Sequence, residues 1–129
     1  MSTYTFSGTM SAPISTVRAR VESALKDEGF GVLTEIDVAA TLKKTLDKDM
    51  RPYKILGACN PQFAHRALEA EPQIGALLPC NVVVREDPSG KTIVEIMDPQ
   101  AVMQLVDRAE VAEIAAEVRK RLERVLAAL

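Results

Sequence analysis

The stretch Tyr53–Pro61, with the sequence YKILGACNP, decides the layout of the chain because it joins a strand to a helix without a loop. Its first seven residues are mostly apolar and contain no proline, which is typical of a central β-strand. Asn60 is a residue type that caps helices, and Pro61 fits the first helical turn. Apolar residues then recur at helical spacing until Glu71-Pro72 ends the helix. The stretch therefore predicts a buried strand that runs directly into a helix.

Working outward from this stretch, strand and helix patterns alternate along the chain. The first helix stops at Gly29, and Asp37 is placed to cap a short second helix. An apolar linker and a hairpin follow, and Asp98-Pro99 repeats the combination of cap and proline. The pattern predicts strands near residues 4–6, 30–37, 53–59, 80–86 and 91–96, and helices near 14–28, 38–46, 61–71, 98–105 and 108–129.

These elements predict an α+β fold, a two-layer sandwich with a mainly antiparallel five-stranded sheet, in β-α-β-β-α-β-β-α order. The two long helices, near 14–28 and 108–129, each have one apolar stripe and must pack on one face of the sheet, with short helices besides. The other face must be polar or covered by a partner chain, so we expect a homodimer. No repeat or linker interrupts residues 1–129, which we expect to form a single domain.

Composition excludes several classes of function. A formal net charge of -2 predicts neither a nucleic-acid partner nor a membrane surface. The chain has no tryptophan and few aromatic residues, so the core must be aliphatic. No signal peptide or apolar stretch of membrane-spanning length is present, so we expect a cytoplasmic protein whose cysteines are thiols. The sequence has no glycine-rich phosphate loop, GxSxG or CxxC motif, and it has one histidine.

The two cysteines are the residues that most suggest chemistry. Cys59 ends a predicted strand and precedes a helix N-terminus, whose partial positive charge lowers a thiol pKa and favours the reactive thiolate. Cys80 begins the next strand, so antiparallel pairing would bring both thiols to the same end of the sheet. Such a pair could bind a soft metal, form a redox disulfide or hold a ligand. The alternative is that both are small buried hydrophobic residues.

Other polar residues have plain structural explanations. His65, on the helix after Cys59, is either a base or ligand for the thiol or simply solvated. Asp37 and Asp98 sit at helix starts and fit caps better than catalytic acids. Arg51 and Tyr53 would contact an anion if they lay in the same cleft as the thiols, and otherwise are an exposed arginine and a half-buried strand tyrosine.

The stretches 51–61 and 74–84, together with Glu35–Val38 and Met97–Pro99, resemble an uncharacterised prokaryotic family called domain of unknown function 302. The resemblance implies a fold like that of the TATA-box-binding protein, but no DNA binding, because a shared fold does not carry a shared function. The family has no established activity, so the resemblance supplies candidate residues without a mechanism and leaves the cofactor unknown. The positions that match the family's motifs are Asp37, Tyr53, Cys59, Asn60, Pro61, Pro79, Cys80 and Asn81.

Three functions remain open at this point. The first is a homodimeric module that binds a small ligand or a soft metal ion, with Cys59, Asn60, Cys80, Asn81, Tyr53 and Asp37 as candidate binding residues. The second is a thiol-dependent enzyme or redox sensor, with Cys59 as nucleophile and Cys80 as resolving thiol. The third is a purely structural domain that binds a partner protein.

Overall fold

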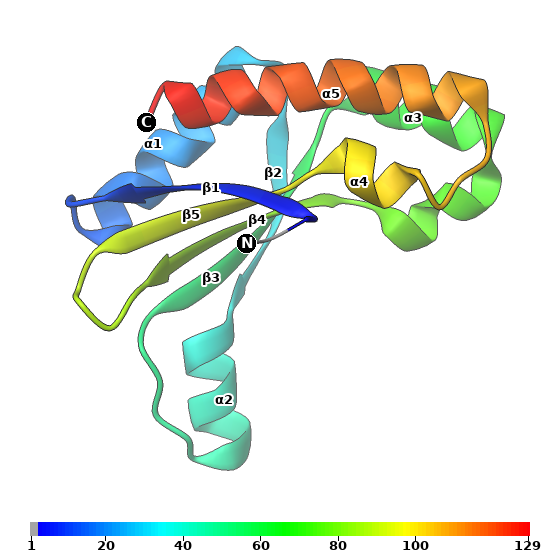
Figure 1. The fold of residues 1–129 in the computed structure, drawn as a ribbon. Coiled ribbons are helices and arrows are strands. Elements are labelled where there is room, and N and C mark those ends of the chain that lie inside the picture. Colours follow the sequence, from blue (N-terminus) through cyan, green and yellow to red (C-terminus); the bar gives the residue numbers. More distant parts are fainter. Residues whose placement is uncertain (1–2) are drawn as a thin grey trace.

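The computed structural model describes residues 3–129, which form a sheet covered by helices (Figure 1). The sheet has five strands in the order β1-β5-β4-β3-β2, and every neighbouring pair is antiparallel. This confirms the predicted α+β class and its antiparallel sheet. In chain order the elements are β1 (Thr5–Met10), α1 (Ile14–Asp27), β2 (Gly31–Asp37), α2 (Val38–Leu46), β3 (Tyr53–Cys59), α3 (Pro61–Ala70), the 3₁₀ helix η1 (Pro72–Leu77), β4 (Cys80–Glu86), β5 (Thr92–Met97), α4 (Pro99–Met103) and α5 (Ala109–Ala127).

The hydrophobic core lies between the sheet and the two long helices α1 and α5. Each helix buries the stripe that its sequence predicts, and the strands contribute alternate residues from the facing side. Burying a Val or Leu side chain fully contributes about 1.5–3 kcal/mol, so this aliphatic layer stabilises the fold without aromatic residues. Its fully buried members include Val17, Val21, Leu25, Leu56, Val82, Val84, Val94, Ile96, Leu122 and Val125.

The end of α1 is fixed by Gly29. Gly29 has a φ of 87°, and the amide of Phe30 donates to the carbonyl of Leu25 at 2.9 Å, as in a Schellman cap. A Cβ at Gly29 would lie 2.9 Å from Nδ2 of Asn60. The C-terminus of α1 therefore packs closely against the residue that begins α3.

Gly57, in the middle of β3, allows a close approach on the side of the sheet away from α1 and α5. A Cβ there would lie 2.3 Å from Oγ1 of Thr34 and 2.9 Å from Cγ of Pro79. The side chain of Thr34 and the ring of Pro79 therefore cover the backbone of Gly57. These two contacts link β2 and the start of β4 across β3.

The face of the sheet away from α1 and α5 is mixed in character rather than uniformly polar. Ile55 pairs with Val83 on this face, and both are half-buried. Arg85 and Glu95 form an ion pair beside them at 2.6 Å. Ile36, paired with Ile55 at the sheet edge, is 49% exposed. Homodimerisation through this face stays a prediction.

Two short elements, η1 and α2, stand out: η1 differs from its predicted structure, and α2 differs from the other α-helices in how it packs. Residues 72–77 fold as η1, where an apolar linker was expected, because the amide of Ile74 donates to the carbonyl of Glu71 at 3.0 Å after Pro72. The short helix α2 begins at its Asp37 cap as predicted, but it buries none of its residues and stands apart at one end of the sheet (Figure 1). No helix within residues 3–129 is long and apolar enough to cross a bilayer.

Candidate functional site: an apolar cavity between α3 and the sheet

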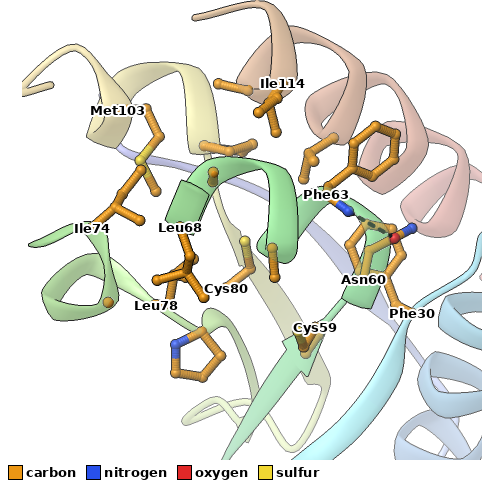
Figure 2. A pocket seen from close by; sticks show the side chains of 18 of the residues that line it. Phe30, Cys59, Asn60, Phe63, Leu68, Ile74, Leu78, Cys80, Met103 and Ile114 are labelled. Atoms are coloured by element: carbon orange, nitrogen blue, oxygen red, sulfur yellow. Dashed lines mark hydrogen bonds between the residues drawn. The ribbon is translucent and has the colours of Figure 1, made fainter. Parts of the chain in front are cut away.

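A cavity of about 410 Å³ lies where α3 and η1 cover the ends of β3 and β4 (Figure 2). α4 and α5 close its far side. In Figure 2 it extends from Ile74 and Met103 on one side to Phe63 on the other. Its volume falls within the range of about 300–1,000 Å³ that is usual for small-molecule sites.

Small side chains on α3 help to make the space. Ala64 and Ala67, one turn apart, both line the cavity, so this side of the helix presents methyl groups where larger residues would fill it. Because the sheet opposite contributes another alanine, Ala58, the helix and the sheet do not interdigitate here. The gap between them is the cavity.

α3 is held to α5 at both of its ends. The ring of Phe63 lies 5.0 Å from the guanidinium carbon of Arg121 and 5.8 Å from that of Arg66, within the range of cation–π contacts. At the other end, Glu71 pairs with Arg108 at 3.4 Å. These contacts keep α3 in place above the space without filling it.

The polar groups of the cavity are few and uncharged. They are the hydroxyl of Thr34, the amide of Asn60 and the thiols of Cys59 and Cys80; none of the described lining residues is charged. Asn60 is 7% exposed, and its Oδ1 accepts from the amide of Phe63 at 3.4 Å, which confirms its predicted role as the cap of α3.

The mouth of the cavity is bordered by exposed apolar side chains. Leu33, at the irregularity in the pairing of β2 with β3, is 67% exposed, and Leu68 of α3 is 40% exposed. Thr34 is also exposed, whereas Cys59 and Pro79 are half-buried. The deep end is built from buried residues of α4, α5 and η1: Ile74, Pro99, Met103, Val111, Ile114 and Ala115.

The two cysteines lie at the same end of the sheet, as antiparallel pairing of their strands requires. Cys80 is directly opposite Ala58 in the register, so their side chains share a face, and that of Cys59, the next residue, lies on the other face. Cβ atoms that point apart cannot be joined by a disulfide without movement of the backbone. Both cysteines are free thiols in the structure.

Burial makes both thiols poor nucleophiles. It raises the pKa of the Cys59 thiol, in contrast to the lowering expected from the helix start that follows it. Burial, with a smaller contribution from the nearby Cys59, raises the pKa of Cys80 to about 11. Near neutral pH both are therefore protonated, which is the form that fits an apolar cavity.

The thiols also lack companions for a metal ion. Within residues 3–129, no three His, Cys, Asp or Glu side chains are placed to hold one ion together. His65 points away from the thiols. Its side chain is exposed and lies 2.8 Å from Glu69, as expected for a solvated histidine.

The structure separates the other predicted site residues from the cavity. Tyr53 begins β3 and pairs with Arg85, whereas Cys59 ends the strand, so the two are about 20 Å apart at about 3.3 Å per residue. Asp37 pairs with Lys54 at the same far end of the sheet, where it caps α2. The structure therefore does not bring Tyr53 or Asp37 together with the cysteines, and Arg51 and Tyr53 match the alternative expectation of an exposed arginine and a half-buried strand tyrosine.

Asn81 also lies outside the cavity. It pairs with Gly57 and is exposed on the face away from the helices, and it does not line the cavity, although Thr34 and Cys59 on that same face do. Sequence reasoning instead missed Phe30, Phe63, Met103 and the α5 residues that line the cavity. The alanine pair on α3 and the apolar linker at residues 74–78 are visible in the sequence, but neither distinguishes a cavity from ordinary close packing.

Comparison with known proteins agrees with this fold. The model of the family described as "Domain of unknown function DUF302" matches residues 6–129. A crystal structure described as an uncharacterized conserved protein DUF302 from Bacillus stearothermophilus is similar, with a TM-score of 0.91 and 31% identity over 98% of each chain. No curated protein matches. The chain belongs to the DUF302 family, as its two cysteine motifs indicated.

Proposed function

We propose that this protein is a binding module for a small molecule, which it holds in the apolar cavity between α3 and the sheet. The observation that carries the proposal is the cavity itself. It has a volume of about 410 Å³, sits against the core, and is roofed by a helix that is fixed at both ends. Concave apolar sites of about 300–1,000 Å³ that open to solvent are typical of small-molecule binding, and this cavity has those features.

The mouth supports the same proposal. Leu33 and Leu68 are large apolar side chains that a folded protein gains nothing by exposing, and both border this cavity. Apolar groups around a concave opening are typical of ligand sites. Thiol chemistry has less support, because both thiols have raised pKa values and their side chains lie on opposite faces of the sheet.

The test is to fill the cavity from two independent sides. Ala67→Leu on α3 and Ala115→Leu on α5 each place a larger side chain in the space, whereas Ala112→Leu adds the same atoms on the exposed side of α5. The probe is N-phenyl-1-naphthylamine, an uncharged dye whose fluorescence rises in apolar surroundings. Thermal unfolding of each variant shows whether it folds.

We expect the wild type and Ala112→Leu to bind the probe alike. Each filled variant should bind it about tenfold more weakly or not at all, with a thermal midpoint close to that of the wild type, because the added side chain occupies existing space. Equal binding by all four proteins, or no binding by the wild type, would overturn the proposal.

A further inference from the structure

We infer that the ligand is an uncharged, lipid-like molecule, with an aliphatic part in the deep end of the cavity and one small hydrogen-bonding group at the mouth. This inference rests on the proposed function and goes beyond it by naming a chemical class. It depends on three features: the chemistry of the deep end, the charges near the cavity, and the polar groups at the mouth.

The deep end offers a ligand almost nothing but hydrocarbon. Its walls are Ile74, Met103, Val111 and Ile114, and its one polar group is the thiol of Cys80, a weak donor. Moving a polar group there without a hydrogen bond costs about 1–3 kcal/mol. The part of the ligand that reaches this end must therefore be apolar.

The basic groups around the cavity are already engaged and cannot neutralise a carboxylate inside it. Arg121 donates to the carbonyl of Glu28 at 3.1 Å and pairs with Glu117 at 3.3 Å. Arg108 pairs with Glu71 at 3.4 Å. Arg66 stacks on Phe63 from the exposed side of α3 and does not line the cavity. No cationic side chain lines the cavity, so a carboxylate at its mouth would lie among apolar side chains without a partner, which disfavours a charged ligand relative to an uncharged one.

Hydrogen-bonding groups of the right kind do occur at the mouth. The hydroxyl of Thr34 lies over the backbone of Gly57, two residues before Cys59, and makes no hydrogen bond to another described residue. A hydroxyl both donates and accepts, so it fits an alcohol, amide or carbonyl group as well as it fits water. Oδ1 of Asn60 is occupied in capping α3.

The volume limits the size of the apolar part. The cavity of about 410 Å³ lies toward the lower end of the range of about 300–1,000 Å³ that is usual for small-molecule sites, so its ligand must be of modest size. A medium-length alkyl chain or an isoprenoid of similar size meets this limit, whereas sugars, nucleotides and amino acids are too polar for the apolar walls of the cavity.

The experiment compares two ligands that share the same alkyl chain length and differ in the head group, one an uncharged alcohol and the other an ionised carboxylate. 1-Dodecanol and dodecanoate are each titrated into wild-type protein that has bound N-phenyl-1-naphthylamine, near neutral pH, where the carboxylate is ionised. Loss of fluorescence measures displacement of the probe. We expect dodecanol to displace the probe at a concentration at least about tenfold lower than dodecanoate. Hexanol should displace it more weakly than dodecanol, because each methylene removed from the apolar wall weakens binding.

The outcomes separate the inference from the function on which it rests. If dodecanoate displaces the probe as well as dodecanol does, the ligand class is wrong while the binding site stands. If the probe binds in the cavity but neither chain displaces it, a lipid-like ligand is likewise excluded. If the probe does not bind, the proposed function fails together with the inference. A loss of dodecanol affinity in Thr34→Val, with probe affinity unchanged, would support the position of the polar group.

Discussion

Cys59 and Cys80 lie at one end of the sheet but on opposite faces of it, because Cys80 is paired with Ala58 rather than with Cys59. The sequence suggests a thiol pair, whereas the register of β3 and β4 gives two isolated thiols. Each is in a different environment: Cys80 is 8% exposed beneath α3, and Cys59 is half-buried at the mouth of the cavity. Their chemistry should therefore differ in a way that can be measured.

Alkylation should distinguish the two thiols. Burial raises the pKa of both, so neither should react with iodoacetamide at a midpoint below the free-thiol value of about 8.5. Cys59 should react as the pH rises above that value, and Cys80 should stay protected in the folded protein. Mass spectrometry of the alkylated peptides measures both rates. A midpoint for Cys59 well below 8.5 would contradict this expectation and support the reactive thiolate that the sequence predicts.

The protein should lose stability at high pH through Cys80. The folded pKa of Cys80, about 11, exceeds its ordinary value of 9.0, so its contribution is complete below 9.0 and is lost as pH rises toward 11. The loss should be on the order of 2–3 kcal/mol. Urea unfolding at several pH values measures it.

The control for this pH dependence is Cys80→Ala, which keeps every other ionisable side chain of the chain. The variant should lose less stability between these pH values than the wild type does. The same slope in both proteins would mean that Cys80 is not desolvated as the structure places it.

Gly57→Ala should destabilise the fold by about 1–3 kcal/mol, because the added Cβ meets Oγ1 of Thr34 and the ring of Pro79. Gly31→Ala is the matched control, since it lies in neighbouring β2 and a Cβ there meets nothing within 4 Å. Urea unfolding should show almost no change for the control. Removing Thr34's hydroxyl in the double variant Thr34→Ala/Gly57→Ala should recover part of the loss. Equal stability of the two glycine variants would show that β2 and Pro79 do not close over β3.

Gly29→Ala should both destabilise the protein and weaken binding in the cavity. Alanine at a φ of 87° is strained by about 1–2 kcal/mol, and its Cβ also presses on Nδ2 of Asn60, which begins α3. Gly90→Ala is the control, because it has a similar φ of 85° but its Cβ meets nothing. The difference in unfolding free energy between the two variants measures the contact with Asn60. We expect lower probe affinity in Gly29→Ala alone; an unchanged affinity would mean that Asn60 does not position α3 over the cavity.

Local signals in the sequence were enough for the elements but not for the site. Asn60 and Asp98 cap α3 and α4 as the combination of cap and proline predicts, and the stripe of α5 is buried as its periodicity predicts. These features depend on neighbours along the chain. Tyr53 and Cys59, at opposite ends of one strand, were grouped because motif membership carries no information on distance.

The cavity itself could not be predicted, because it is the space left unfilled between several segments that are far apart in the sequence. Ala64 and Ala67 on α3 face Ala58 on β3 only because the chain between β3 and β4 folds back over the sheet. In a sequence, two alanines on one face of a helix indicate ordinary close packing. Only the position of the sheet that the helix faces shows whether a space remains.

The most direct test of the central claim is methyl NMR of the isoleucine δ1 groups during titration with 1-dodecanol. Ile74 and Ile114 line the cavity, whereas Ile55 and Ile93 lie on the face of the sheet away from it. We predict shifts that saturate at Ile74 and Ile114, with Ile55 and Ile93 unchanged. Shifts at Ile55 and Ile93 alone, or no saturable shift at Ile74 and Ile114, would contradict the account.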